Sequence, residues 1–277
     1  MKITVLGSAA AEAMPALWCE CETCAIARER GGRDVRRRTS YCIDDDTLVD
    51  FGPDAFWQTT SFNIDLRKID RIVFTHRHSD HLNPLDLAWR RDGFSVVTKP
   101  LKVFGSRPVF VRLMKEVAGE GAAFRLEELR IVPQLLQHGK RIEDGGLGIL
   151  PLAANHDPGG SPFIFVLSRG GRKVLICNDT GDPPEATWQC LAGQGIDAAF
   201  IDSTMGLAHA DCASGHMGVK AVVKARDRLL ACGALKPDAQ VFANHFSHNG
   251  HALHADLEAF FAPKGIGVGY DGLVVSC

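Results

Sequence analysis

The sequence predicts an α/β fold in which helices cover the outer faces of sheets, and three observations support this prediction. Short apolar runs rich in β-branched residues are bounded by Gly, Pro or Asp, which is typical of buried strands. Helical patterns alternate with these runs, and several begin with proline in the first turn. The 277 residues are 45% apolar, which is enough for a large buried core.

The expected elements follow one another along the whole chain. Strands are expected at ITVL (3–6), DTLVDF (46–51), RIVFT (71–75), LKVF (101–104), GILPLA (148–153), PFIFVLS (162–168), KVLICND (173–179), AAFID (198–202) and QVFANH (240–245). Helices are expected at Pro84–Arg91, Pro108–Val117, Pro183–Leu191, His216–Cys232 and Leu253–Phe261. Because no repeat or long linker divides the chain, we expect one domain over residues 1–277.

Charge and cysteine content limit the classes of partner. The formal net charge is −2, so no overall positive field would attract nucleic acid. No apolar run reaches the roughly 18 residues that span a bilayer, so a membrane location is not expected. Nine cysteines without an export signal favour thiols or metal ligands over disulfides, and hence a reducing cytoplasm. The sequence does not fix the oligomeric state and is compatible with a homodimer.

The segment FTHRHSDHL (74–82) places three imidazoles and a carboxylate within six residues, directly after an expected strand. In an extended chain His76 and His78 share one side, and a tight turn after Thr75 would bring Asp80 and His81 back towards them. Imidazole and carboxylate suit zinc and similar divalent ions. The alternative is a set of solvated loop histidines, but this clustering favours two halves of a metal site.

The H-x-H-x-D-H motif resembles that of the metallo-β-lactamase superfamily of hydrolases. The resemblance implies an αββα sandwich with metal ions at the edge of the sheets. That family uses three further ligands at later strand ends, and His156, Asp179 and His245 lie there in order. The resemblance implies one metal held by His76, His78 and His156, and a second held by Asp80, His81 and His245. Asp179 would bridge the two metals, although an Asp after a strand is more often a turn residue.

Two adjacent cations explain the crowding of ligands. They can share a water molecule and lower its pKa from about 15.7 towards about 7, which gives a bridging hydroxide at neutral pH. The same charges can stabilise the oxygens of an ester or phosphodiester under attack. The expected class is therefore metal-dependent hydrolysis. Zn, Mn and Fe all accept these ligands, and Zn or Mn is favoured.

A second cluster lies in WCECETC, where Cys19, Cys21 and Cys24 fall within six residues. Three close thiols favour a closed tetrahedral zinc site that needs a fourth ligand, and His248 is the candidate. This structural zinc would tie the N-terminal loop to the loop after His245. Reduced thiols without metal are the alternative.

The cysteine knuckle and the histidine motif together resemble the phosphoribosyl cyclic phosphodiesterase branch of the superfamily, over nearly the whole chain. That branch implies a phosphodiesterase for a small, anionic and in some cases cyclic substrate. His216 would protonate the leaving group there, with Asp80 as a second catalytic residue, whereas a helix-capping role is the alternative for His216. A thioester, lactone or amide hydrolase stays open, as does a non-hydrolytic protein like PqqB, which has a similar knuckle.

Overall fold

Fourteen strands form two sheets in the computed structural model, which describes residues 1–118 and 125–277. The first sheet contains β1 (Lys2–Gly7), β2 (Ser40–Ile43), β3 (Thr47–Val49), β4 (Arg71–Val73), β5 (Leu101–Gly105), β6 (Ile131–Leu135) and β14 (Val274–Ser276), in the order β14-β1-β2-β3-β4-β5-β6. The second contains β7 (Ile142–Asp144), β8 (Leu147–Ala153), β9 (Phe163–Arg169), β10 (Arg172–Cys177), β11 (Ile196–Asp202), β12 (Leu235–Asn244) and β13 (Gly267–Val268), in the order β13-β12-β11-β10-β9-β8-β7.

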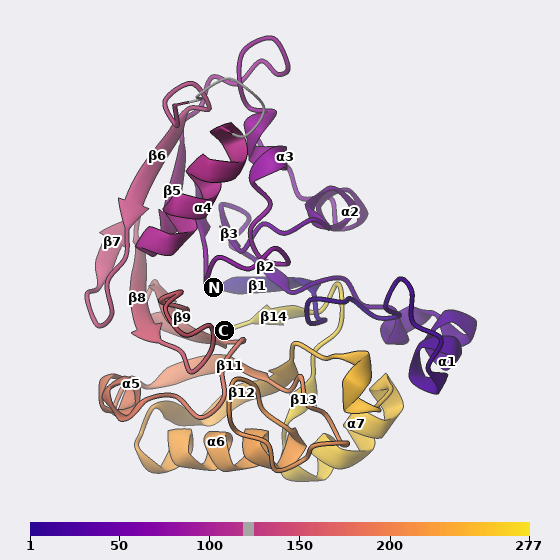
Figure 1. Cartoon of the computed structure of the whole chain (residues 1–277). Helices are drawn as coiled ribbons and strands as arrows, with labels where there is room; N and C mark the ends of the chain where they lie inside the picture. Colours follow the sequence, from indigo (N-terminus) through magenta and orange to yellow (C-terminus); the bar gives the residue numbers. More distant parts are fainter. Residues whose placement is uncertain (119–124) are drawn as a thin grey trace.

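Helices cover the outer face of each sheet (Figure 1). Buried side chains of α2 (Ala55–Ser61), α3 (Pro84–Ala88) and α4 (Arg107–Ala118) pack on the first sheet. Those of α5 (Glu185–Leu191), α6 (Val219–Ala231) and α7 (His254–Phe261) pack on the second. Single 3-10 turns lie at Gly32–Asp34, His248–Gly250 and Ala262–Lys264. The layers therefore form the αββα sandwich that the sequence predicts.

The central core follows from the two-residue period of the strands. In β10, Val174 and Ile176 face the opposite sheet, whereas Leu175 and Cys177 face the helices. Successive side chains of a strand point to opposite faces, so a continuously apolar strand buries both of its sides. This pattern explains why KVLIC forms a strand that is covered on both faces.

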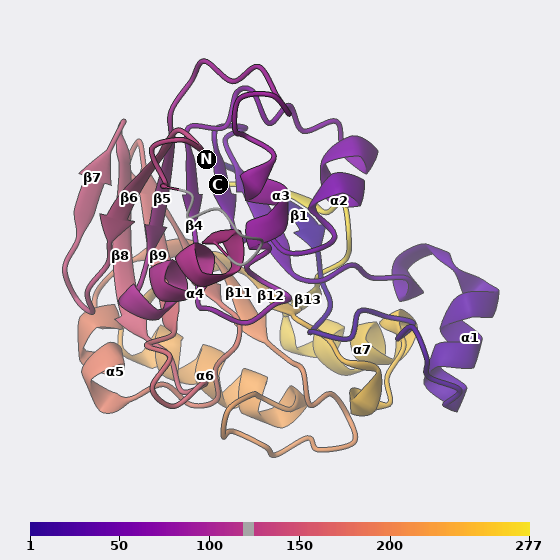
Figure 2. The ribbon, with the colours of Figure 1, turned by 45° about the horizontal axis from the view of Figure 1, so that its top comes forward.

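One helix lies apart from these layers. Helix α1 (Glu22–Arg30) projects from the body of the molecule with the N-terminal loop (Figures 1 and 2). A small cluster of Met14, Ala27 and Leu253 packs it against the start of α7. The α1 segment therefore has little core of its own beyond these contacts.

Several boundaries differ from those expected. All nine expected strands and five expected helices are present, but α6 begins at Val219, so the expectation that His216 starts this helix was wrong. Gly218 is the N-cap residue, and His216 lies in the preceding loop. The helices α1 and α2 and the strands β2, β6, β7, β13 and β14 were not expected, because these segments are short or lack a clear apolar period. Within the described residues, no helix has the length and apolar character to cross a bilayer.

Candidate metal centre

The site lies where several strands end at the same edge of the two sheets. β3, β4, β5 and β6 are parallel, as are β10, β11, β12 and β13. The carboxyl ends of parallel strands share one edge, and loops there commonly carry functional groups. Asp50 and His245 each follow a strand directly, Asp179 lies two residues after β10, and their φ angles are positive at 64°, 64° and 52°. Such strained backbone is typical of functional sites.

The first group of donors consists of His76, His78 and His156, whose nitrogen atoms lie within 4.8 Å of one another. Nδ1 of His78 lies 3.2 Å from Nε2 of His156. Nδ1 of His76 lies 3.0 Å from Oγ1 of Thr75, which leaves Nε2 directed at the other imidazoles. Burial holds the pKa of His76 well below its ordinary value, so its ring is neutral and can donate a lone pair.

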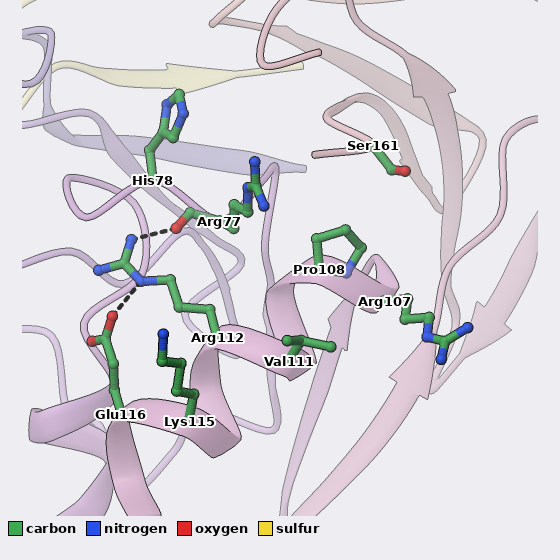
Figure 3. Close-up of a pocket in the computed structure, with 9 residues that line it drawn as sticks. All are labelled: Arg77, His78, Arg107, Pro108, Val111, Arg112, Lys115, Glu116 and Ser161. Atoms are coloured by element: carbon green, nitrogen blue, oxygen red, sulfur yellow. Dashed lines mark hydrogen bonds and ion pairs between the residues drawn. The ribbon is translucent and has the colours of Figure 1, made fainter. Parts of the chain in front are cut away.

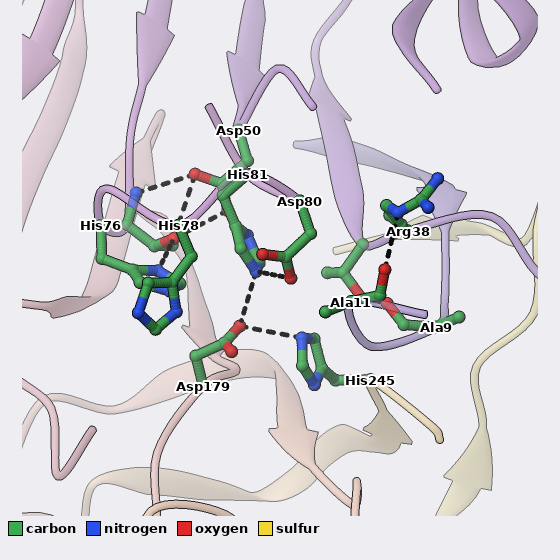
Figure 4. Close-up of polar contacts among 12 residues, drawn as sticks. Ala9, Ala11, Arg38, Asp50, His76, His78, Asp80, His81, Asp179 and His245 are labelled. Carbon is green, nitrogen blue, oxygen red and sulfur yellow. Dashed lines mark hydrogen bonds and ion pairs between the residues drawn. The ribbon is translucent and has the colours of Figure 1, made fainter. Parts of the chain in front are cut away.

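The second group consists of Asp80, His81, Asp179 and His245 (Figure 4), and all four are buried. Nε2 of His81 lies 2.9 Å from Oδ2 of Asp80 and 3.0 Å from Oδ2 of Asp179. Nε2 of His245 lies 2.9 Å from the same Asp179 oxygen. Asp179 also approaches the first group, because its Oδ1 lies 3.6 Å from Nε2 of His156.

Four of these buried atoms make no well-formed hydrogen bond within the described part of the chain: Nε2 of His76, and Nε2 of His81, Nε2 of His245 and Oδ2 of Asp179, whose close contacts are with one another and with Asp80. Unpaired buried polar atoms are costly, so they need a partner that protein groups do not supply. A divalent cation satisfies imidazole and carboxylate donors together. The donor set therefore fits two metal ions that share Asp179.

Electrostatics support the same interpretation. Burial alone would lower the pKa of His81, but the charges of Asp80 and Asp179 outweigh it and hold that pKa well above its ordinary value. Burial alone would raise the pKa of Asp179, yet the adjacent His245 and His81 hold it well below its ordinary range. A concentration of negative charge that holds a proton on an imidazole also attracts a cation.

A carboxylate behind the site orients His216. Nδ1 of His216 lies 2.9 Å from Oδ2 of Asp202 and 3.1 Å from Oγ1 of Thr204. Burial alone would lower the pKa of His216, but the Asp202 carboxylate outweighs it and raises that pKa to about 9. Because Nδ1 faces Asp202, the other nitrogen of the ring is available to the cleft.

A cleft of about 250 Å³ opens over these groups. Its lining includes six of the residues that the sequence analysis singled out, together with Glu12 and Asn249: His78, Asp80, His156, Asp179, His216 and His245. His76 and His81 lie beneath it and are fully buried. The structure thus brings all seven expected ligands and His216 to one place.

Sequence reasoning gave no role to two carboxylates that support the site. Asp50 accepts hydrogen bonds from the backbone N–H and the hydroxyl of Thr75 and lies 2.7 Å from Nδ1 of His81. Asp202 holds His216 and accepts from the backbone N–H of Asp179 at 3.0 Å. Asp50 is the next-to-last residue of the expected strand DTLVDF, and Asp202 is the last residue of AAFID. These positions near strand ends are the signal that could have identified them.

The cysteine cluster is assembled as its spacing predicts. Sγ of Cys19 and Sγ of Cys21 each lie 3.5 Å from Nδ1 of His248, and the ligand atoms of these residues and Cys24 lie within 4.8 Å of one another. Burial would raise the pKa of Cys21, but the backbone N–H of Cys24 and His248 lower it to about 6. Three thiols and an imidazole in this arrangement fit a tetrahedral zinc.

The chain is similar to known proteins in its sequence family and in its fold. A family model described as a beta-lactamase superfamily domain matches residues 46–235. The crystal structure of a diphosphatase from the PhnP family has a TM-score of 0.74 at 22% identity, over 100% of this chain and 97% of the other. Zn²⁺-bound PqqB from Methylobacterium extorquens has a TM-score of 0.78 at 18% identity, over 100% of both chains. At these identities the likeness concerns the fold.

A curated relative matches a smaller part of this chain. An octanoyltransferase of Porphyromonas gingivalis is 33% identical over 100 residues, which are 33% of this chain and 19% of the relative. The match therefore spans about a fifth of the length of that relative.

Proposed function

The chain belongs to the beta-lactamase superfamily and has the metallo-β-lactamase fold, and we propose that it is a metal-dependent phosphodiesterase for a small anionic substrate. The observation that carries this proposal is the position of Asp179, which lies between the His76, His78 and His156 group and the Asp80, His81 and His245 group. Proteins of this fold are typically metal-dependent hydrolases.

The two donor groups have distinct tasks in this proposal. His76, His78 and His156 would hold one divalent cation, the second group would hold another, and Asp179 would be shared. Cations bound there lower the pKa of water and neutralise charge on phosphoryl oxygens. Asp80 lines the cleft and can accept a hydrogen bond from the attacking water.

His216 is the residue that we propose as general acid. Asp202 fixes its Nδ1, so the Nε2 proton of the imidazolium can pass to the departing oxygen of the ester. Its side chain is 24% exposed, which allows contact with a substrate in the cleft. Asp202 acts through His216 and is a positioning residue.

The choice of a phosphodiester rests on two lines of support. The fold and the N-terminal cysteine cluster resemble the phosphodiesterase branch over nearly the whole chain, and a full-length structural match is a diphosphatase. The cleft also offers cationic sites for an anionic phosphoryl group. Thioesters, lactones and amides are the competing substrate classes.

Turnover of a substrate panel tests the proposal. Purified full-length protein, loaded with Zn or Mn, is assayed with bis(p-nitrophenyl) phosphate, a thioester and a lactone, beside Asp80→Ala and the exposed control Asp238→Ala. We expect diester turnover in wild type and in the control, and a loss of more than about 100-fold in Asp80→Ala. Turnover of the thioester or lactone alone would reject the phosphodiesterase, and no turnover at all would favour a non-hydrolytic role.

A further inference from the structure

Two strands of the second sheet end in asparagines that face the first sheet. In β10, Val174 and Ile176 face the first sheet, and Asn178 continues this alternation directly after the strand. In β12, Phe242 packs on the same central core, and Asn244 is the last residue of the strand. Because every second side chain of a strand shares a face, both asparagines point into the space between the sheets. Both are buried there.

Tyr41 joins these two asparagines from the opposite sheet. It lies in β2, its side chain is buried, and its ring packs on Phe200 of β11 with a centroid separation of 5.1 Å. Nδ2 of Asn244 donates a hydrogen bond to Oη of Tyr41 at 2.7 Å, and Oη donates to Oδ1 of Asn178. An amide nitrogen only donates, so the phenol directs its own proton to Asn178. One hydroxyl therefore connects the ends of β10 and β12 across β11.

Each of the two asparagines directly precedes a proposed metal ligand. Asn178 precedes Asp179, and Asn244 precedes His245. The positive φ angles of these two ligands are conformations that residues other than glycine keep only where surrounding contacts hold them. Nε2 of His245 lies 2.9 Å from Oδ2 of Asp179, so a shift of either strand end would change the separation of these donor atoms.

Stability alone does not account for this polar group in the core. Phenylalanine would fill nearly the same space as Tyr41, and apolar side chains would pack well between the sheets. Nδ2 of Asn178 and Oδ1 of Asn244 form no hydrogen bond with any residue that the structure describes. A buried network whose members are only partly paired is less favourable than an apolar core. The network therefore has a use other than stability.

We propose that Tyr41 is a positioning residue, whose hydroxyl fixes the ends of β10 and β12 so that Asp179 and His245 bind the same metal ion. The inference rests on the proposed function through the metal centre and does not depend on the choice of substrate. Tyr41 acts through Asn178 and Asn244 and binds no metal itself. Without the hydroxyl, Oδ1 of Asn178 and Nδ2 of Asn244 lose their shared partner, and the two strand ends can move apart.

Zinc affinity of the full-length protein tests the inference in competition with a chromophoric chelator. Wild type should bind three zinc ions per chain, and loss of one binding step in His245→Ala identifies the step that belongs to the Asp80, His81, Asp179 and His245 group. In Tyr41→Phe we expect the affinity of this step to fall about tenfold, as for other groups that support metal ligands. The zinc of the cysteine cluster should bind as in wild type.

Two control variants separate positioning from a general loss of stability. Tyr270→Phe removes the other phenol of the chain, which packs on Arg33 outside both donor groups. Val222→Ala opens a cavity under α6, on the face of the second sheet away from Tyr41, and lowers the free energy of unfolding. Both controls should keep the zinc affinity of wild type. Equal affinity in wild type and Tyr41→Phe, or equal weakening in Tyr41→Phe and Val222→Ala, would overturn the inference.

Turnover of bis(p-nitrophenyl) phosphate by the same proteins distinguishes this inference from the proposed function. Weaker zinc binding in Tyr41→Phe, with no turnover by zinc-loaded wild type, would reject the phosphodiesterase and support the role of Tyr41. Turnover by wild type, with unchanged zinc affinity in Tyr41→Phe, would reject only the role of Tyr41. Zinc bound at the cysteine cluster alone would overturn both.

Discussion

Oδ2 of Asp50 lies 2.7 Å from Nδ1 of His81, and both side chains are buried. A carboxylate only accepts hydrogen bonds, and the other contacts of Asp50 come from the N–H and hydroxyl donors of Thr75. A proton of His81 therefore lies on Nδ1, which leaves Nε2, directed towards Asp80 and Asp179, as the nitrogen that can bind a metal. This pair sets the tautomer on which a metal at His81 depends.

Replacing Asp50 with asparagine should weaken metal binding without removing a ligand. Loss of a carboxylate behind a ligating histidine typically costs about 10-fold to 100-fold in metal affinity. Competition with a chromophoric chelator measures this affinity. Asp238→Asn is the control, because Asp238 is exposed on β12. Equal zinc affinity in wild type and Asp50→Asn would contradict the proposed orientation of His81.

Gly52 should tolerate no side chain, because a Cβ there would lie 1.9 Å from the backbone oxygen of Asp80. Gly52→Ala must shift the Asp80 segment, so we expect reduced metal content and a loss of about 1–3 kcal/mol in the free energy of unfolding. Gly170→Ala is the matched control, since its φ is 58° and open space surrounds it. That variant should lose about 1 kcal/mol through backbone strain and keep its metals. Full metal content in Gly52→Ala would show that the contact with Asp80 is unimportant.

The cysteine cluster should contribute one zinc and part of the stability. In Cys21→Ser, elemental analysis should find one fewer zinc per chain, and the Tm should fall by about 5 °C, because only a small apolar cluster otherwise holds α1. Cys190→Ser removes a thiol outside the cluster and should retain all metals. An unchanged zinc count in Cys21→Ser would favour simple reduced thiols.

Asp271 should make stability depend on pH between about 4 and 6. Burial raises the pKa of Asp271 from 3.8 to about 6, although the backbone N–H of Arg37 and the hydroxyl of Ser8 oppose the shift. The folded state binds this proton more tightly, so the contribution is complete below pH 3.8 and is lost as pH rises through about 6. The loss is about 3 kcal/mol.

Denaturant unfolding of wild type and Asp271→Asn across this range checks the prediction at a fixed metal concentration. The difference in unfolding free energy between the two proteins should change by about 2.4 kcal/mol from pH 4 to pH 7, which is most of the full loss. Because asparagine does not titrate, a difference that stays constant with pH would show that folding does not raise the pKa of Asp271.

The sequence predicted the ligand cluster better than the groups that support it. His76, His78, Asp80 and His81 are adjacent in the chain, and His156, Asp179 and His245 follow apolar runs whose ends meet at one edge of the sheets. Their roles as metal ligands stay predictions. Asp50 and Asp202 were missed because a single Asp after a strand is usually a turn residue, and only tertiary contacts distinguish the two cases.

Other features depend on long-range packing. The expected helix start at His216 was wrong because Gly218 is the N-cap, which leaves His216 in a loop beside Asp202. A cleft of about 740 Å³ (Figure 3) is lined both by Arg77, in the loop after β4, and by residues of α4. No periodic pattern connects these segments, so only the fold shows that they share a cavity.

The central claim is that hydrolysis depends on metals held around Asp179. The most direct test measures kcat/KM for bis(p-nitrophenyl) phosphate against the number of metals bound per chain, in wild type and Asp179→Asn. We predict that wild type gains activity as the metal content rises from one to three, and that Asp179→Asn retains the zinc of the cysteine cluster but loses more than about 100-fold in activity. Full activity in chelated protein, or in Asp179→Asn, would contradict the account.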